Sequence, residues 1–118
     1  MQRAIGIGGL FFRARDPEAL NRWYERHLGI AATAESTDVW RQEGGPTVWA
    51  AFAADTDYFG RADQAFMVNF RVADLDAMLA QLRTAGATVE DRIDEGEQGR
   101  FGWATDPEGN RFELWQPA

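Results

Sequence analysis

Apolar and polar positions follow a similar order in two stretches of the chain, GLFFRARD at residues 9–16 and, in altered form, MVNFRVAD at residues 67–74. When the two stretches are aligned, the Phe-Arg pair and the closing Asp coincide. Within each stretch, the alternation of side chains predicts a β-strand with two different faces. The repeat predicts that the chain is built from two similar units.

A helix is predicted directly after each of these strands. Asp16 and Asp74 are of a residue type that caps helix N-termini, and Pro17 suits the first helical position. Apolar residues then recur at helical spacing until Gly29 in the first half and Gly86 in the second, and glycine commonly ends a helix. The recurring apolar residues are Leu20, Trp23, Tyr24 and Leu28 in the first helix and Leu75, Met78, Leu79 and Leu82 in the second.

Strand and turn signals follow each predicted helix. The predicted strands cover residues 30–36, 38–42 and 47–53 in the first half and 87–93, 100–105 and 111–116 in the second, with polar turns at residues 43–46, 94–99 and 106–110. Each half is therefore predicted to be a β-α-β-β-β unit, at roughly residues 1–60 and 66–118. Residues 54–64 link the two units, and their aromatic side chains predict that the linker packs over another part of the molecule.

The predicted fold class is α+β, with a single domain over residues 1–118. One β-α-β-β-β unit is too small to cover both faces of its sheet. The two βαβββ modules are therefore expected to form a concave sheet around a shared cavity, with the helices on the outside.

Composition narrows the possible chemistry. The chain has no cysteine, and all twelve of its basic residues are arginine. Disulfides, thiolate chemistry, Cys-based metal sites and lysine Schiff bases are therefore excluded. The net charge of −7 argues against a nucleic-acid partner, and no apolar run approaches the ~20 residues of a membrane span. No signal peptide is evident, so a cytoplasmic location is expected.

Two longer motifs stand out in the chain, RARDPEALNRWYERHLGI at residues 13–30 and GRFGWATDPEGNRFELWQP at residues 99–117. They resemble motifs of the vicinal oxygen chelate superfamily, which includes glyoxalase I, bleomycin-resistance proteins and extradiol dioxygenases. The resemblance covers essentially the whole chain and is greatest to small glyoxalase-like members. It implies the glyoxalase/bleomycin resistance/dihydroxybiphenyl dioxygenase fold and a homodimer.

The same resemblance assigns four metal-ligand positions, one on each of four strands. The first position holds Gly9 and the third holds Met67, while the second falls near Trp49. None of these side chains suits a hard or borderline divalent ion, and only the fourth position, Glu113, retains a suitable ligand. The sequence therefore predicts no divalent metal site and no cofactor.

Glu113 is the candidate catalytic residue, because strand alternation places it with Trp115 on the cavity side. A carboxylate in an aromatic cavity needs a partner, and Arg13 is the expected one, with Arg71 as the alternative. Glyoxalase I has an arginine four residues after its first metal ligand that binds the substrate's carboxylate, and Arg13 occupies that position. The alternative interpretation is that Arg13 and Arg71 are structural or solvated charges beside the helix starts.

Aromatic and polar side chains from several segments could line the cavity. Ordinary core packing is the alternative for each of them. The candidate ligand-binding residues are Arg13, Phe11, Trp40, Trp49, Tyr58, Met67, Asn69, Trp103 and Trp115.

Two functional hypotheses follow from these residues. The first is a metal-independent protein that binds a small aromatic or anionic molecule, as the drug-binding relatives do. The second is a lyase or isomerase in which Glu113 acts as acid or base and Arg13 holds an anionic substrate. A metal-dependent lyase or dioxygenase with non-standard ligands is a third possibility.

Overall fold

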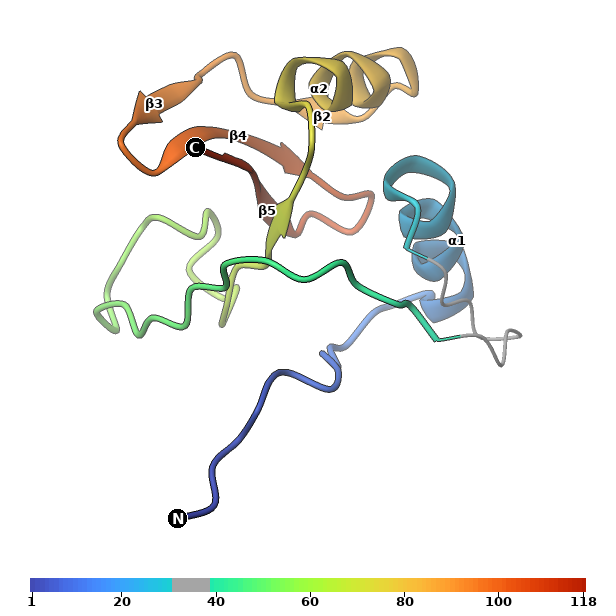
Figure 1. Ribbon diagram of the computed structural model, residues 1–118. Helices are drawn as coiled ribbons and strands as arrows, with labels where there is room; N and C mark the ends of the chain where they lie inside the picture. Colours follow the sequence, from blue (N-terminus) through green and yellow to red (C-terminus); the bar gives the residue numbers. More distant parts are fainter. Residues whose placement is uncertain (31–38) are drawn as a thin grey trace.

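The computed structural model describes residues 1–30 and 39–118, which form two helices and five strands (Figure 1). The expected strand at residues 30–36 lies almost wholly outside the described residues. The elements are α1 (Pro17–Leu28), β1 (Asn69–Arg71), α2 (Leu75–Thr84), β2 (Thr88–Val89), β3 (Asp94–Gly96), β4 (Gly99–Thr105) and β5 (Arg111–Pro117).

Both helices begin and end as their sequences predict. The Asp16 side chain accepts a hydrogen bond from the backbone N–H of Ala19 at 3.1 Å, and Asp74 accepts one from Ala77 at 3.0 Å. These carboxylates satisfy N–H groups that have no partner within the helix. Gly29 ends α1 in the left-handed conformation, with φ of 72°, which glycine adopts without steric cost.

The strands form one mixed sheet in the order β1-β5-β4-β2, with β3 pairing with β4. β1 runs parallel to β5, and the other neighbours are antiparallel. In this register Glu113 on β5 lies between Asn69 on β1 and Trp103 on β4. Side chains directly opposite one another share a face of the sheet, so these three residues project from the same side.

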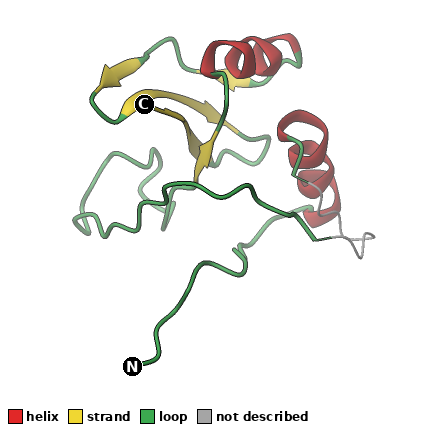
Figure 2. Ribbon diagram, in the orientation of Figure 1, coloured by secondary structure: helices red, strands yellow, loops and turns green. Residues whose placement is uncertain are grey.

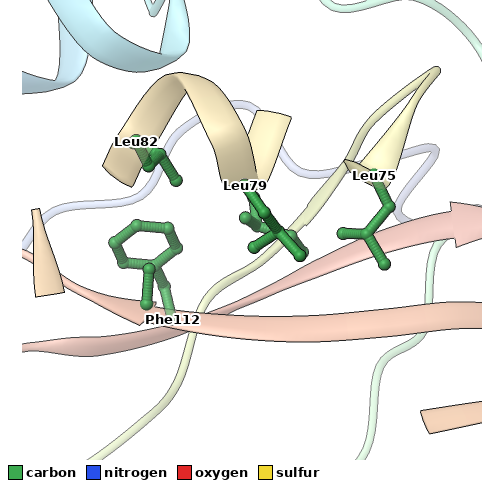
Figure 3. Close-up of a cluster of buried hydrophobic side chains, with 6 residues drawn as sticks. Leu75, Leu79, Leu82 and Phe112 are labelled. Carbon is green, nitrogen blue, oxygen red and sulfur yellow. The ribbon is translucent and has the colours of Figure 1, made fainter. Parts of the chain in front are cut away.

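The opposite face of the sheet carries the hydrophobic core. Leu75, Leu79 and Leu82 of α2 pack against Phe112 of β5, as Figure 3 shows, and all four side chains are at most 2% exposed. A Cβ atom on Gly102 would lie 3.2 Å from a methyl group of Leu79. Glycine at this position of β4 therefore lets α2 approach the sheet closely.

α1 covers the same face through two aromatic side chains. The rings of Trp23 and Tyr24 lie 6.1 and 5.9 Å from the ring of Phe112. The Tyr24 hydroxyl donates a hydrogen bond to Asp106 at 2.7 Å, which ties α1 to the loop before β5. The α+β fold class is thus confirmed, and both helices lie on the same face of the sheet.

The two halves of the repeat differ in what they form. The second half contributes all five strands of the described residues, whereas the first half contributes only α1 (Figure 2). Residues 1–14 and 39–53 were expected to contain strands, but they form none and donate no backbone hydrogen bond to another strand. An alternating pattern selects the face that a strand would bury, but a strand also needs a neighbour for its backbone groups.

The second half also departs from its prediction in two places. The strand expected at residues 87–93 is limited to Thr88–Val89. The turn expected at residues 94–99 contains β3, because Asp94–Gly96 pair with β4 and leave a shorter turn before Gly99. Neither helix of the described residues is long and apolar enough to cross a membrane.

Candidate functional site

The face of the sheet opposite the helices is called the open face here, and it gathers several of the predicted site residues. Strand register places Asn69, Glu113 and Trp103 side by side across three strands. Two positions further along the strands, Phe101 on β4 lies opposite Trp115 on β5. The open face therefore combines one carboxylate and one amide with aromatic rings.

Glu113 is 8% exposed and accepts hydrogen bonds from two neutral donors. The Asn69 amide donates to Oε1 at 2.6 Å, and the Tyr58 hydroxyl donates to Oε2. The expected arginine partner is therefore wrong: Arg71 donates to the backbone carbonyl of Glu43, and Arg13 is exposed on the segment that does not join the sheet. Neutral donors satisfy the carboxylate oxygens and leave the negative charge without a directly bound cation.

Tyr58 comes from the linker between the two halves and reaches the sheet from outside it. Its ring lies edge-on to Trp103, with centroids 6.3 Å apart, and stacks on Phe52 at 5.5 Å. Burial, together with the hydrogen bond to Glu113, raises the pKa of Tyr58 from 10.0 to about 12. The phenol is therefore protonated at neutral pH and acts as a donor to the carboxylate.

The linker is fixed to β5 by paired hydrogen bonds. The Gln64 side chain accepts from the backbone N–H of Arg111 at 2.9 Å and donates to its carbonyl at 2.8 Å. The Arg111 guanidinium donates to the backbone carbonyl of Tyr58, and the Arg61 side chain donates to that of Glu108. Residues 54–64 thus pack over the open face, in agreement with the sequence prediction.

Arg111 is a site residue that the sequence analysis missed. It forms a bidentate ion pair with Glu90, both contacts being 2.8 Å, and these hydrogen bonds hold the pKa of Glu90 below its usual value. Its guanidinium carbon lies 5.5 Å from the centre of the Tyr58 ring and 5.2 Å from that of Trp103. The position of Arg111 two residues before Glu113, on the same face of a strand, was the signal that could have identified it.

Trp103 lies beneath these groups with no exposed surface, and its indole N–H has no hydrogen-bond partner among the described residues. Trp103 lowers the pKa of Tyr58 slightly, against the larger effects of burial and of Glu113. A buried donor without an acceptor is uncommon, because it has lost its bond to water without replacement.

A second aromatic pair continues the open face. The rings of Phe101 and Trp115 are stacked 5.8 Å apart with an interplanar angle of 5°. The indole N–H of Trp115 donates to the backbone carbonyl of Gln98 at 2.9 Å, which fixes the ring. Two stacked rings therefore lie beside the carboxylate on the open face.

The predicted site residues separate into two groups in the structure. Tyr58, Asn69, Trp103, Glu113 and Trp115 belong to the open face, and the sulfur of Met67 lies 3.8 Å from Arg111. Phe11 and Trp49 are 92% and 87% exposed on segments without strand pairing. Trp40 lies on the helix side, where its ring is 6.4 Å from that of Phe70 and lines a hollow of about 340 Å³.

The residues present do not fit a divalent metal ion. Among residues 1–30 and 39–118, no three side chains of the ligating types His, Asp and Glu are grouped so as to hold one. The positions that the family resemblance assigns to ligands hold Gly9, Met67 and Trp49 beside Glu113. Both oxygens of Glu113 already accept hydrogen bonds from protein donors.

Several solved structures have the same fold, and three of them are described here. TnmS3, an antibiotic binding protein from Streptomyces sp. CB03234, is 24% identical over 99% of this chain and 100% of that chain, with a TM-score of 0.65. TioX from Micromonospora sp. ML1 is 18% identical over 89% and 93% of the two chains, with a TM-score of 0.56. A member of the glyoxalase/bleomycin resistance protein/dioxygenase superfamily from Sphaerobacter thermophilus is 19% identical over 87% and 90%, with a TM-score of 0.53.

Comparison with curated protein sequences gives no significant match. The model of the glyoxalase-like domain family, in contrast, matches residues 9–115, which include both helices and the open face. This match spans most of the chain and agrees with the fold of the three structures above. The chain therefore belongs to the family of glyoxalase-like domains.

Proposed function

We propose that this protein binds a small aromatic molecule on the open face of its sheet without a divalent metal ion. The observation that carries the proposal is Glu113, a buried carboxylate held by two neutral donors and bordered by the aromatic rings of Trp103 and Tyr58. Flat apolar walls around a few fixed polar groups are typical of small-molecule sites. The antibiotic binding protein TnmS3, which has the same fold, supports this class of function.

A titration of the intrinsic tryptophan fluorescence tests the proposal, because Trp103 and Trp115 both belong to the open face. A library of planar aromatic compounds is expected to contain ligands that change the emission in a saturable way. Trp103→Phe should abolish most of the change caused by a ligand at this site. A library without any saturable ligand would contradict the proposal.

A lyase or isomerase is the second candidate function, and the same carboxylate favours it. Glu113 is buried beside a phenol that could relay a proton, which suits a general acid or base. Glu113→Gln separates the two functions: a binding protein keeps its affinity within about tenfold, whereas an enzyme loses most of its turnover. Glu95→Gln, which changes an exposed carboxylate on β3, is the matched control. Mass spectrometry of each ligand after incubation shows whether it is converted.

We also propose that the protein forms a homodimer. The large apolar side chains that are exposed in the described residues all lie before residue 67. Within residues 1–30 and 39–118, β1 also leaves one edge of the sheet without a partner strand. Apolar segments and an open strand edge are both surfaces that a second copy can cover. Light scattering should give twice the mass of one chain, and Phe11→Asp combined with Trp49→Asp should reduce it to that of one chain. A monomeric mass for the unmodified protein would contradict the proposal.

A further inference from the structure

The Tyr58 side chain occupies the open face as a bound ring would. It enters from the linker, donates its hydroxyl hydrogen to Glu113 and lies edge-on to Trp103. The Arg111 guanidinium lies 5.5 Å from the centre of its ring. A cation at this distance favours an electron-rich ring.

One polar group at this position is left unsatisfied. The indole N–H of Trp103 is completely buried and has no acceptor among the described residues, although the Tyr58 ring packs edge-on against the indole. A hydroxyl group can donate one hydrogen bond and accept another at the same time. A hydroxyl placed slightly differently from that of Tyr58 could therefore donate to Glu113 and accept from Trp103.

The other tyrosine of the chain shows why Glu113, once Tyr58 has left, would need a new donor. Tyr24 also donates to a carboxylate, but Asp106 accepts three further hydrogen bonds, from Glu108 and Asn110. Glu113 accepts only one bond besides that of Tyr58 in the described residues. The linker that carries Tyr58 has an exposed tip, since Asp57 and Gly60 on either side are exposed.

We propose that the ligand of the open face is a hydroxylated aromatic ring that displaces the Tyr58 phenol, donating its hydroxyl hydrogen to Glu113 and accepting a hydrogen bond from the indole N–H of Trp103. The proposal rests on the proposed binding function and names its ligand class. The Arg111 guanidinium then covers the face of the bound ring, as it covers Tyr58 in the structure. No bond is made or broken, so the ligand is bound unchanged.

Three bicyclic probes that differ in a single substituent test the ligand class: 2-naphthol, 2-methoxynaphthalene and naphthalene. In calorimetric titrations, 2-naphthol should bind at least about tenfold more tightly than either of the others, because only it can donate to a carboxylate. Tyr58→Phe removes the competing hydroxyl and should strengthen 2-naphthol binding. Tyr24→Phe removes the other tyrosine hydroxyl and should change nothing at the open face.

The indole N–H of Trp103 gives a second readout in nitrogen–proton correlation spectra. Addition of 2-naphthol should move its proton resonance downfield, because the N–H gains an acceptor. Trp103→Phe assigns the signal, and Glu113→Gln should reduce the preference for 2-naphthol to about twofold, since a neutral amide is a weaker acceptor than a carboxylate.

The outcomes separate the ligand class from the binding function. If 2-methoxynaphthalene binds as tightly as 2-naphthol, the hydroxyl is not recognised and the inference is wrong, while binding at the open face stands. If 2-naphthol binds without moving the Trp103 signal, the placement of the hydroxyl is wrong. If neither the probes nor any compound of the wider aromatic library binds, the proposed function fails and the inference fails with it.

Discussion

Replacement of each tyrosine by phenylalanine tests how strongly the buried carboxylates depend on their donors. Tyr58→Phe leaves Glu113 with Asn69 as its only donor among the described residues. Tyr24→Phe leaves Asp106 with three donors. Both substitutions keep the ring and remove a single hydroxyl, so they form a matched pair.

The two substitutions should differ in their effect on the free energy of unfolding. Loss of a hydrogen bond to a charged group costs about 1.5–3 kcal/mol when that group stays buried and poorly satisfied. Tyr58→Phe should lower the free energy of unfolding by about 2 kcal/mol, because Glu113 is 8% exposed and loses one of two donors. Tyr24→Phe should cost about 1 kcal/mol or less, because the remaining donors still satisfy Asp106.

Urea denaturation followed by tryptophan fluorescence measures both values, provided that the slope of the unfolding free energy against urea is unchanged. Ring packing alone predicts no difference between the two substitutions, because both keep the ring and its contacts, those of Tyr24 with Phe70 and Phe112 and that of Tyr58 with Trp103. A larger loss of stability for Tyr24→Phe than for Tyr58→Phe would therefore refute the reasoning from carboxylate donors.

Three further predictions concern stability. Gly102→Ala places a methyl group 3.2 Å from Leu79 and should lower the free energy of unfolding by about 1–3 kcal/mol, measured by thermal or urea denaturation. Gly96→Ala is the control, because nothing lies within 4 Å of a Cβ atom at that position. Equal losses of stability in the two variants would contradict the packing argument. Because the pKa of Tyr58 is raised from 10.0 to about 12, stability should fall as pH rises from 10 to 12, and a pH series of urea midpoints should show a smaller fall for Tyr58→Phe. Hydrogen bonds from Arg111 lower the pKa of Glu90 below 4.5, so stability present above pH 4.5 should be lost as pH falls through that lower pKa. Glu90→Gln should make the acid unfolding curve shallower, and an unchanged curve would exclude this ion pair as a source of acid sensitivity.

The helices and the faces of β5 could be predicted because their signals are local. The residues that begin or end a helix contact groups only a few positions away, so a short stretch of sequence contains both partners of each contact. They are Asp16, Asp74 and Gly29. Alternation predicted that Glu113 and Phe112 project from opposite faces of β5. The structure confirms this, since Phe112 packs in the core beneath α2 and Glu113 contacts Tyr58 on the other face. The strands of the first half were not predictable in the same way, because a strand depends on a neighbour that the pattern does not identify.

The partner of Glu113 could not be predicted, because the contact with Tyr58 spans 55 positions and depends on the path of the linker. The sequence argument chose an arginine since a buried carboxylate usually needs a charged partner. The structure satisfies the carboxylate with a phenol and an amide instead. Arg111 escaped prediction for a related reason, because its partner Glu90 lies 21 positions away on a different segment.

The choice of neutral donors decides what the open face can recognise. Two guanidinium groups lie near Trp103, but Arg111 is paired with Glu90 and Arg92 is paired with Asp94 at 2.6 and 2.8 Å. An anionic ligand would have to displace one of these carboxylates to find a cation, and it would also meet the charge of Glu113. A neutral donor needs only to replace the Tyr58 hydroxyl. The open face is therefore better matched to a neutral hydroxylated ring than to the anionic ligand that the arginine hypothesis required.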